Sequence, residues 1–215
     1  MKVVISALGL GFAYCGLHSV HEEARKSLVT LHYSNSNTGS SFAISSSGLA
    51  LTAKHCTEIR STTQENQVVE VVTVDKKRDV AVLQLPRHKR YSYLKLGNSD
   101  LLKPGEEVLL CGYGYRSFLC NSGYIQGRDS DYMYASALMM HGQSGGAVLN
   151  TAGEVVGINS GHFPCTKENR ENDPFHAETA IFVPINQAKD LLQECCYETS
   201  TGWKVRPSTG TSPPS

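Results

Sequence analysis

The sequence predicts an all-β protein of two packed, six-stranded antiparallel β-barrels with a short C-terminal helix. Short runs of Val, Ile, Leu and Tyr recur along the chain between clusters of Gly, Ser, Asn and Pro, a pattern typical of strands and turns. A cluster of turn residues from Gly97 to Gly105 separates about six early strands from about six later ones. We expect strands at residues 28–33, 40–46, 48–53, 67–74, 79–85, 107–112, 122–127, 131–138, 146–150, 154–159 and 179–184.

Helical spacing of apolar residues occurs in two stretches only, a short one from His21 to Ser27 and one over residues 186–196 that follows Pro184. We expect one folded unit over residues 20–200, with the first barrel at about 24–96 and the second at about 97–185. A cleft between the barrels should bring loops from both halves together. Residues 204–215 are rich in Ser, Thr, Gly and Pro, and we expect them to be disordered.

Composition argues against a nucleic-acid partner. Of 215 residues, 40% are apolar and 19% are charged, and 20 basic side chains balance 20 acidic ones. Those proportions are typical of a soluble globular protein. The densest basic stretches, at residues 76–78 and 87–90, are short and are interpreted as solvated turns rather than as a binding stripe.

The N-terminus has two interpretations. Met1 and Lys2 precede an apolar run over residues 3–17 that is too short for a stable membrane span. One basic residue, an apolar region and the small residues Ala13 and Cys15 fit a secretory signal over residues 1–19. The alternative is an apolar N-terminal segment, in which residues 3–10 form an early strand or a packing arm.

Seven cysteines bear on the same choice, because removal of a signal that contains Cys15 leaves six. An even number suits an oxidising compartment and predicts disulfide bonds. The sequence does not determine their pairing, although a short loop between Cys111 and Cys120 can bring those two together. We find no spacing typical of metal ligands, so we expect neither a metal nor another cofactor.

Three segments carry residues suited to acyl-transfer chemistry: Leu51–Cys56, Arg78–Leu83 and His141–Ala147. Ser144 is the candidate nucleophile, and His55 is the base that takes its proton. A carboxylate fixes the tautomer of such a histidine, and Asp79 has that predicted role. Asp75 is a competing choice, but Asp79 directly precedes an apolar run. The glycines beside Ser144 allow the backbone N–H groups of Gly142 and Ser144 to point at one developing oxyanion.

These segments resemble the active-site segments of the chymotrypsin/trypsin-like peptidases, and their surroundings look most like the HtrA-type branch. The similarity covers roughly residues 28–193, and it includes 38–44, 96–100, 153–159 and 182–185. It implies the two-barrel fold and a serine endopeptidase that acts on protein or peptide substrates. Zymogen-type relatives carry Asp immediately before the serine, whereas this chain has Gln143, so we expect no activation by N-terminal trimming.

The resemblance also indicates residues of the substrate pocket. Leu138 lies six residues before Ser144, where relatives that cut after Lys or Arg carry an acid, so we expect an uncharged residue before the cleaved bond. Ser160, Gly161 and His162 fall where relatives form one pocket wall, and Ala180 falls near the opposite wall. His162 or His176 offers an alternative, a preference for Glu or Gln.

Two other functions remain open from the sequence. One is a catalytically silent binding protein on the same scaffold. The other is a viral or phage protease that processes a polyprotein inside a cell, in contrast to the secreted or periplasmic location that a signal peptide predicts. No segment argues for a particular oligomeric state.

Overall fold

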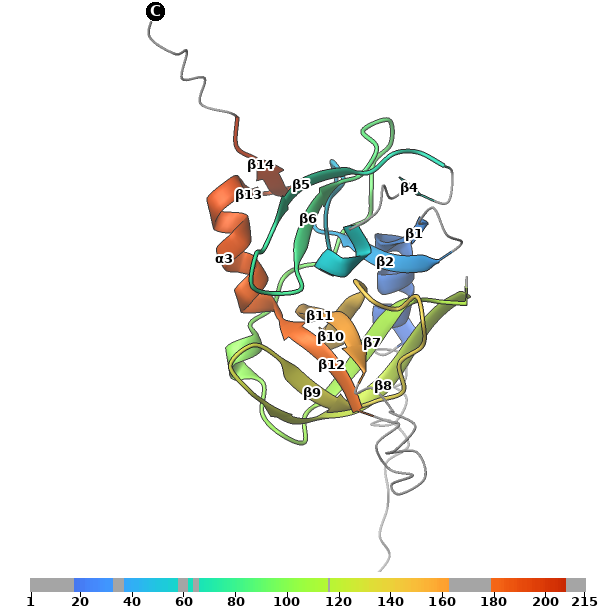
Figure 1. Cartoon of the computed structure of the whole chain (residues 1–215), viewed down its shortest axis with the longest axis vertical. Helices are drawn as coiled ribbons and strands as arrows, with labels where there is room; N and C mark the ends of the chain where they lie inside the picture. The colour runs from blue at the N-terminus through green and yellow to red at the C-terminus, as the bar shows by residue number, and fades with distance from the viewer. Residues whose placement is uncertain are drawn as a thin grey trace, which may run out of the picture.

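The computed structural model describes residues 18–32, 37–57, 62–63, 66–115, 117–162 and 179–207 of the chain. It is nearly all β, and its two halves are stacked, with helix α3 (Ile185–Cys195) running beside both (Figure 1). The fold class predicted from the sequence is therefore confirmed. The halves differ in one respect, because only the second is a closed barrel.

The first half is a six-stranded antiparallel sheet in the order β4-β1-β2-β3-β6-β5. Its strands are β1 (Leu28–His32), β2 (Thr38–Ala43), β3 (Leu49–Thr52), β4 (Thr62–Thr63), β5 (Glu70–Val74) and β6 (Ala81–Gln84). Its end strands β4 and β5 do not pair with each other among the described residues, so this half is a half-barrel rather than the closed barrel that we expected. The sequence did not indicate β4, whose two residues are too few for a pattern.

The second half is a closed barrel in the order β10-β11-β12-β9-β8-β7. Its strands are β7 (Glu107–Gly114), β8 (Ser117–Arg128), β9 (Met133–Ser136), β10 (Ala147–Asn150), β11 (Val155–His162) and β12 (Thr179–Pro184). Leu110, Met133 and Phe182 are completely buried in its interior. Cys111 of β7 faces Cys120 of β8 and forms a disulfide with it, as the short loop between them suggested.

An apolar cluster joins the two halves, and it includes Phe42 and Leu51 from the first and Leu149 and Ile158 from the second. The connection between the halves contains the short helix η2 (Ser99–Leu101). Helix α3 (Ile185–Cys195) holds this connection, because Asn186 Nδ2 donates to Asn98 Oδ1 at 2.6 Å.

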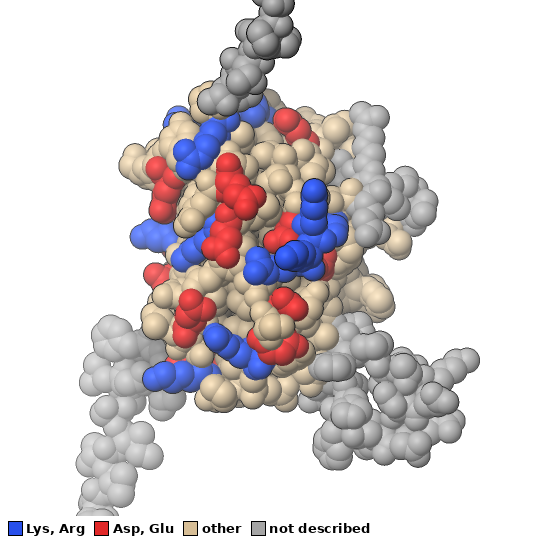
Figure 2. Space-filling view, turned by 60° about the vertical axis from the view of Figure 1, so that its left-hand side comes forward, with Lys and Arg blue, Asp and Glu red and all other residues tan. Residues whose placement is uncertain are grey.

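A second helix covers residues 18–27, so it begins three residues earlier than expected and reaches into the segment interpreted as a possible signal. Residues 1–17 lie outside the described part of the chain. Within the described residues, no helix has the length and apolar character that crossing a membrane requires. Acidic and basic side chains are interspersed over the face that Figure 2 shows.

The C-terminal end differs from the prediction. A hairpin of β13 (Cys196–Thr199) and β14 (Gly202–Val205) follows α3. Cys196 therefore begins a strand rather than ending the helix, and Lys204 and Val205 are strand residues where disorder was expected from residue 204. The hairpin returns to the first half, where Trp203 N donates to Ile44 O at 3.3 Å. Residues 208–215 lie outside the described part.

Candidate active site

His55 and Asp79 form a close pair in the first half. His55 lies in the short helix η1 (Lys54–Thr57), which follows β3, and Asp79 lies just before β6. His55 Nδ1 is 2.8 Å from Asp79 Oδ2, and the His55 backbone N–H donates to Asp79 Oδ1 at 2.9 Å. Pairing of the adjacent strands β3 and β6 brings the two segments together. One carboxylate therefore orients both the ring and the backbone of the histidine.

The pair shifts the acidity of both groups. The hydrogen bond with Asp79 raises the pKa of His55 above its ordinary value near 6.5. Burial by itself raises the pKa of Asp79, but hydrogen bonds from His55 and Ser160 outweigh burial and lower it below its ordinary value. Asp79 is thus a carboxylate at neutral pH and favours a positive charge on the His55 ring.

Asp75, the competing carboxylate, has a different position. Its Oδ1 accepts the backbone N–H groups of Lys77 and Arg78 at 2.8 and 3.1 Å, and its Oδ2 lies 3.5 Å from the Arg78 guanidinium. It thereby closes the turn between β5 and β6. The geometry favours Asp79 over Asp75 as the partner of His55.

Ser160 links this pair to the second half. Its hydroxyl donates to Asp79 Oδ2 at 2.5 Å. Ser160 lies at a bulge of β11, where the register against β12 shifts between Asn159 and Gly161. A bulge redirects a side chain out of the regular alternation of a strand, and here it accompanies a hydroxyl that points toward the first half.

Ser144 lies on a tight turn between β9 and β10. Gly145 in this turn has φ +81°, and a Cβ atom there would lie 2.2 Å from Ser40 O. A Cβ at Gly146 would lie 2.1 Å from Cys111 O. Glycine is thus required at both positions, because the turn packs directly against backbone.

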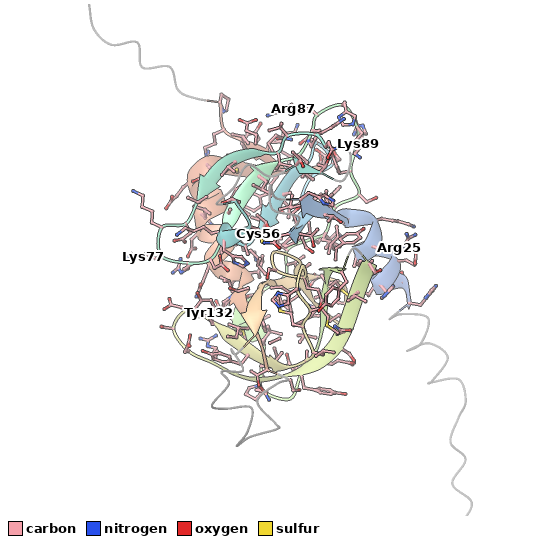
Figure 3. All side chains as sticks on the ribbon, turned by 45° about the vertical axis from the view of Figure 1, so that its right-hand side comes forward. Arg25, Cys56, Lys77, Arg87, Lys89 and Tyr132 are labelled. Carbon is pink, nitrogen blue, oxygen red and sulfur yellow. A yellow bond between two sulfur atoms is a disulfide. The ribbon has the colours of Figure 1, made fainter. Side chains whose placement is uncertain are left out.

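Contacts with the first half hold Ser144 next to the histidine segment. The Ser144 carbonyl accepts from the backbone N–H of Ser40 at 2.8 Å and from the thiol of Cys56, the residue after His55, at 3.6 Å. Figure 3 shows Cys56 near the junction of the two halves. The Ser144 hydroxyl donates to Ser160 O at 3.3 Å. No hydrogen bond joins it to His55 among the described residues.

The turn before Ser144 leaves two backbone donors open. Gly142 has φ +99°. Within the turn, the N–H groups of Gln143, Gly145 and Gly146 all have backbone acceptors. Those of Gly142 and Ser144 donate to no acceptor in the described part of the chain, which is the arrangement that an oxyanion site requires.

Gln143 holds this turn from inside the protein. Its side chain is completely buried, its Nε2 donates to Leu110 O at 3.2 Å, and its Oε1 accepts from Met140 N at 2.7 Å. The turn therefore has its own internal support at the position where zymogen-type relatives carry Asp.

Ser40 is a residue that the sequence analysis did not single out. Its buried hydroxyl donates to Gly142 O and accepts from Tyr113 N, both at 2.7 Å, while its backbone N–H binds Ser144 O. It lies within the 38–44 segment that supported the resemblance, but only the fold reveals these contacts. The sequence predicts Ser160 in the pocket wall and does not indicate its hydrogen bond to Asp79.

The predicted pocket residues lie on the second barrel. Leu138 has 49% of its surface exposed, and its carbonyl accepts from Asn121 Nδ2 at 2.8 Å. Ala180 is buried on β12 opposite the backbone of His162 on β11. The His162 side chain and His176 lie outside the described part. No group of three or more potential metal ligands occurs among the described residues.

The closed barrel and the half-barrel, with His55, Asp79 and Ser144 at their junction, are consistent with the two-barrel fold of chymotrypsin-like peptidases. The trypsin-like peptidase domain family matches residues 39–158, which is more than half of the chain. The chain belongs to this family.

Its similarity to the HtrA branch extends beyond the matched region. The chain is 30% identical over 184 residues to serine protease HTRA1 of Xenopus tropicalis, an alignment that covers 77% of this chain and 37% of the relative. It is 28% identical over 192 residues to a probable periplasmic serine endoprotease DegP-like of Rhizobium meliloti, covering 80% and 36%. The chain thus spans about a third of these relatives.

Solved structures agree on the fold. The HtrA-type protease AlgW with tripeptide superposes with a TM-score of 0.67 at 23% identity, covering 81% of this chain and 62% of that one.

Proposed function

We propose that the protein is a serine endopeptidase that hydrolyses peptide bonds through an acyl-enzyme on Ser144. The observation that carries this proposal is the continuous set of contacts from His55 through Asp79 and Ser160 to Ser144. The open N–H groups of Gly142 and Ser144 and the membership of the trypsin-like peptidase family support it.

The proposed reaction has two halves. The Ser144 hydroxyl attacks the substrate carbonyl carbon as His55 takes its proton, and the oxyanion is bound by the N–H groups of Gly142 and Ser144. His55 then protonates the leaving amine, which departs and leaves an ester on Ser144. Water, deprotonated by His55, attacks that ester and releases the acid. Asp79 keeps the ring oriented and favours its cationic form throughout.

We further propose that the residue before the cleaved bond is uncharged. Leu138, which is half exposed, offers an apolar group where basic-specific relatives carry an acid. The disulfide between Cys111 and Cys120, and the DegP-like relative that is named as a probable periplasmic endoprotease, support a secreted or periplasmic location.

A fluorophosphonate probe tests the enzyme directly, because it reacts with an activated serine. Wild-type protein should be labelled and should digest casein, whereas Ser144→Ala should do neither while it remains folded by circular dichroism. Folded wild-type protein that is neither labelled nor active would contradict the proposal and favour a binding protein.

A further inference from the structure

Two loops of the first half carry adjacent basic residues, and they differ in how they are held. One lies between β5 and β6 and contains Lys76, Lys77 and Arg78. The other follows β6 and reads Arg87-His88-Lys89-Arg90. All four residues of the second loop are exposed and belong to no helix or strand.

Contacts of Asp75 restrain the first loop, residues 76–78. Asp75 accepts the backbone N–H groups of Lys77 and Arg78 and pairs with the Arg78 guanidinium, whose side chain is only 32% exposed. The next residue, Asp79, is bonded to His55. To extend this loop, a protease would have to break the three contacts of Asp75 and to displace Asp79 from His55, which is more than the second loop requires.

The second loop is held through Tyr91 and Lys89, whose Nζ lies 5.6 Å from the centre of the Tyr91 ring, but its two arginines are exposed. Neither Arg87 nor Arg90 has an ion pair or side-chain hydrogen bond among the described residues. Figure 3 shows Arg87 and Lys89 at the outer end of the first half, away from Cys56 at the junction. Exposed loop tips of this kind are preferred sites of proteolytic cutting.

From this contrast we infer that the Arg90–Tyr91 bond is a processing site for a second protease, one of the subtilisin-like class that requires basic residues at the first, second and fourth positions before the cut. Arg90, Lys89 and Arg87 occupy those positions. Water adds across the peptide bond, which leaves a carboxylate on Arg90 and an amine on Tyr91. Self-cleavage does not account for such a cut, because Leu138 gives the protein's own site no acidic partner for arginine.

The Arg90–Tyr91 bond lies in the connection between the two halves, so its cleavage should leave both halves folded. β6 ends at Gln84 and η2 begins at Ser99, so the cut severs the connection between the halves without interrupting any strand. Contacts across the cut would hold the two chains together. Leu94 N donates to Ala43 O at 3.0 Å, and Trp203 N reaches Ile44 O. The product is a folded two-chain protein.

Tyr91 restrains the loop. Its hydroxyl donates to Pro86 O at 2.9 Å and its backbone N–H donates to Ser46 O at 3.2 Å. The loop must loosen here before a protease can extend it. Tyr91→Phe removes the hydroxyl bond and keeps the ring, and it should therefore speed cutting about fivefold.

The test uses the full chain with Ser144→Ala, so that its outcome does not depend on the proposed function. A purified subtilisin-like protease of the stated class is added, and products are followed on denaturing gels and by N-terminal sequencing. We expect one new N-terminus at Tyr91, and two fragments that elute together in native gel filtration. Arg90→Ala should abolish the cut, whereas Arg78→Ala should leave its rate unchanged.

Two results would overturn the inference. One is a native chain that resists cutting at Arg90 under conditions in which the urea-unfolded chain is cut there. The other is a native chain cut first after Arg78. As a separate readout that does rest on the proposed function, wild-type protein cut at Arg90 should still react with the fluorophosphonate, because His55 and Ser144 stay in one folded unit.

Discussion

The two sides of the active site are held in different ways. On the first half, His55 is oriented by the carboxylate of Asp79, through side-chain contacts that depend on charge. On the second half, Ser144 is oriented by a backbone turn whose glycines touch carbonyl oxygens directly. The first arrangement responds to pH and to loss of charge, whereas the second responds to added volume. Substitutions should therefore separate the two sides by the kind of damage that they cause.

The largest expected effect is that of Ser144→Ala, because this variant removes the hydroxyl that we propose as the acceptor of the acyl group. We expect turnover to fall by about 10⁶-fold with the fold intact. Measurement of kcat on casein-derived peptides checks this, with the exposed Ser92→Ala as the control. If kcat of Ser144→Ala fell only modestly, the nucleophile would be a residue other than Ser144.

Asp79→Asn should come next, with a fall in kcat/KM of about 10⁴-fold. It should also change the pH profile. His55 must be neutral to take a proton, and its raised pKa makes wild-type activity fall as pH drops through a value above about 6.5. Loss of the carboxylate lowers that pKa, so the acid limb moves to lower pH. Asp75→Asn is the matched control and should retain activity; if it were the more damaging variant, the assignment of Asp79 would be wrong.

Gly146→Ala tests how the turn that carries Ser144 responds to added side-chain volume. A Cβ there would overlap Cys111 O, so the turn must shift, and we expect a loss of about 3 kcal/mol of unfolding free energy. Gly127→Ala is the control, because a Cβ at Gly127 would meet nothing within 4 Å. Urea denaturation of both variants measures the difference. Equal stability would show that the turn is looser than its contacts indicate.

We expect the smallest effect from Ser160→Ala. Ser160 links the two sides of the site through its hydroxyl. The variant removes one hydrogen bond to Asp79, so the pKa of that carboxyl should rise and kcat/KM should fall about tenfold. Ser160→Thr, which keeps the hydroxyl, should recover part of the loss. A null result in pH profiles and kinetics would make Ser160 only a pocket residue.

The sequence predicted the strands and the segments with His55, Asp79 and Ser144, because alternating apolar runs and short motifs are local signals. The sequence does not show which segments that are far apart in the chain contact each other. The hydroxyl of Ser40 binds the turn before Ser144, and nothing near Ser40 in the chain indicates that partner. The β13–β14 hairpin was missed because its residues are mostly polar and resemble a tail, although Trp203 is 91% buried against the first half, with 9% exposed.

That hairpin has a consequence for biosynthesis. All six strands of the first sheet leave the ribosome well before the second barrel, but the turn at Ser45 is paired by Gly202, near the C-terminal end of the described chain. Domains generally fold in the order in which they are made. Here the first half acquires this backbone partner only when the β13–β14 hairpin emerges, so removal of the hairpin should expose the adjacent buried Ile44 in nascent chains and leave them in need of chaperones.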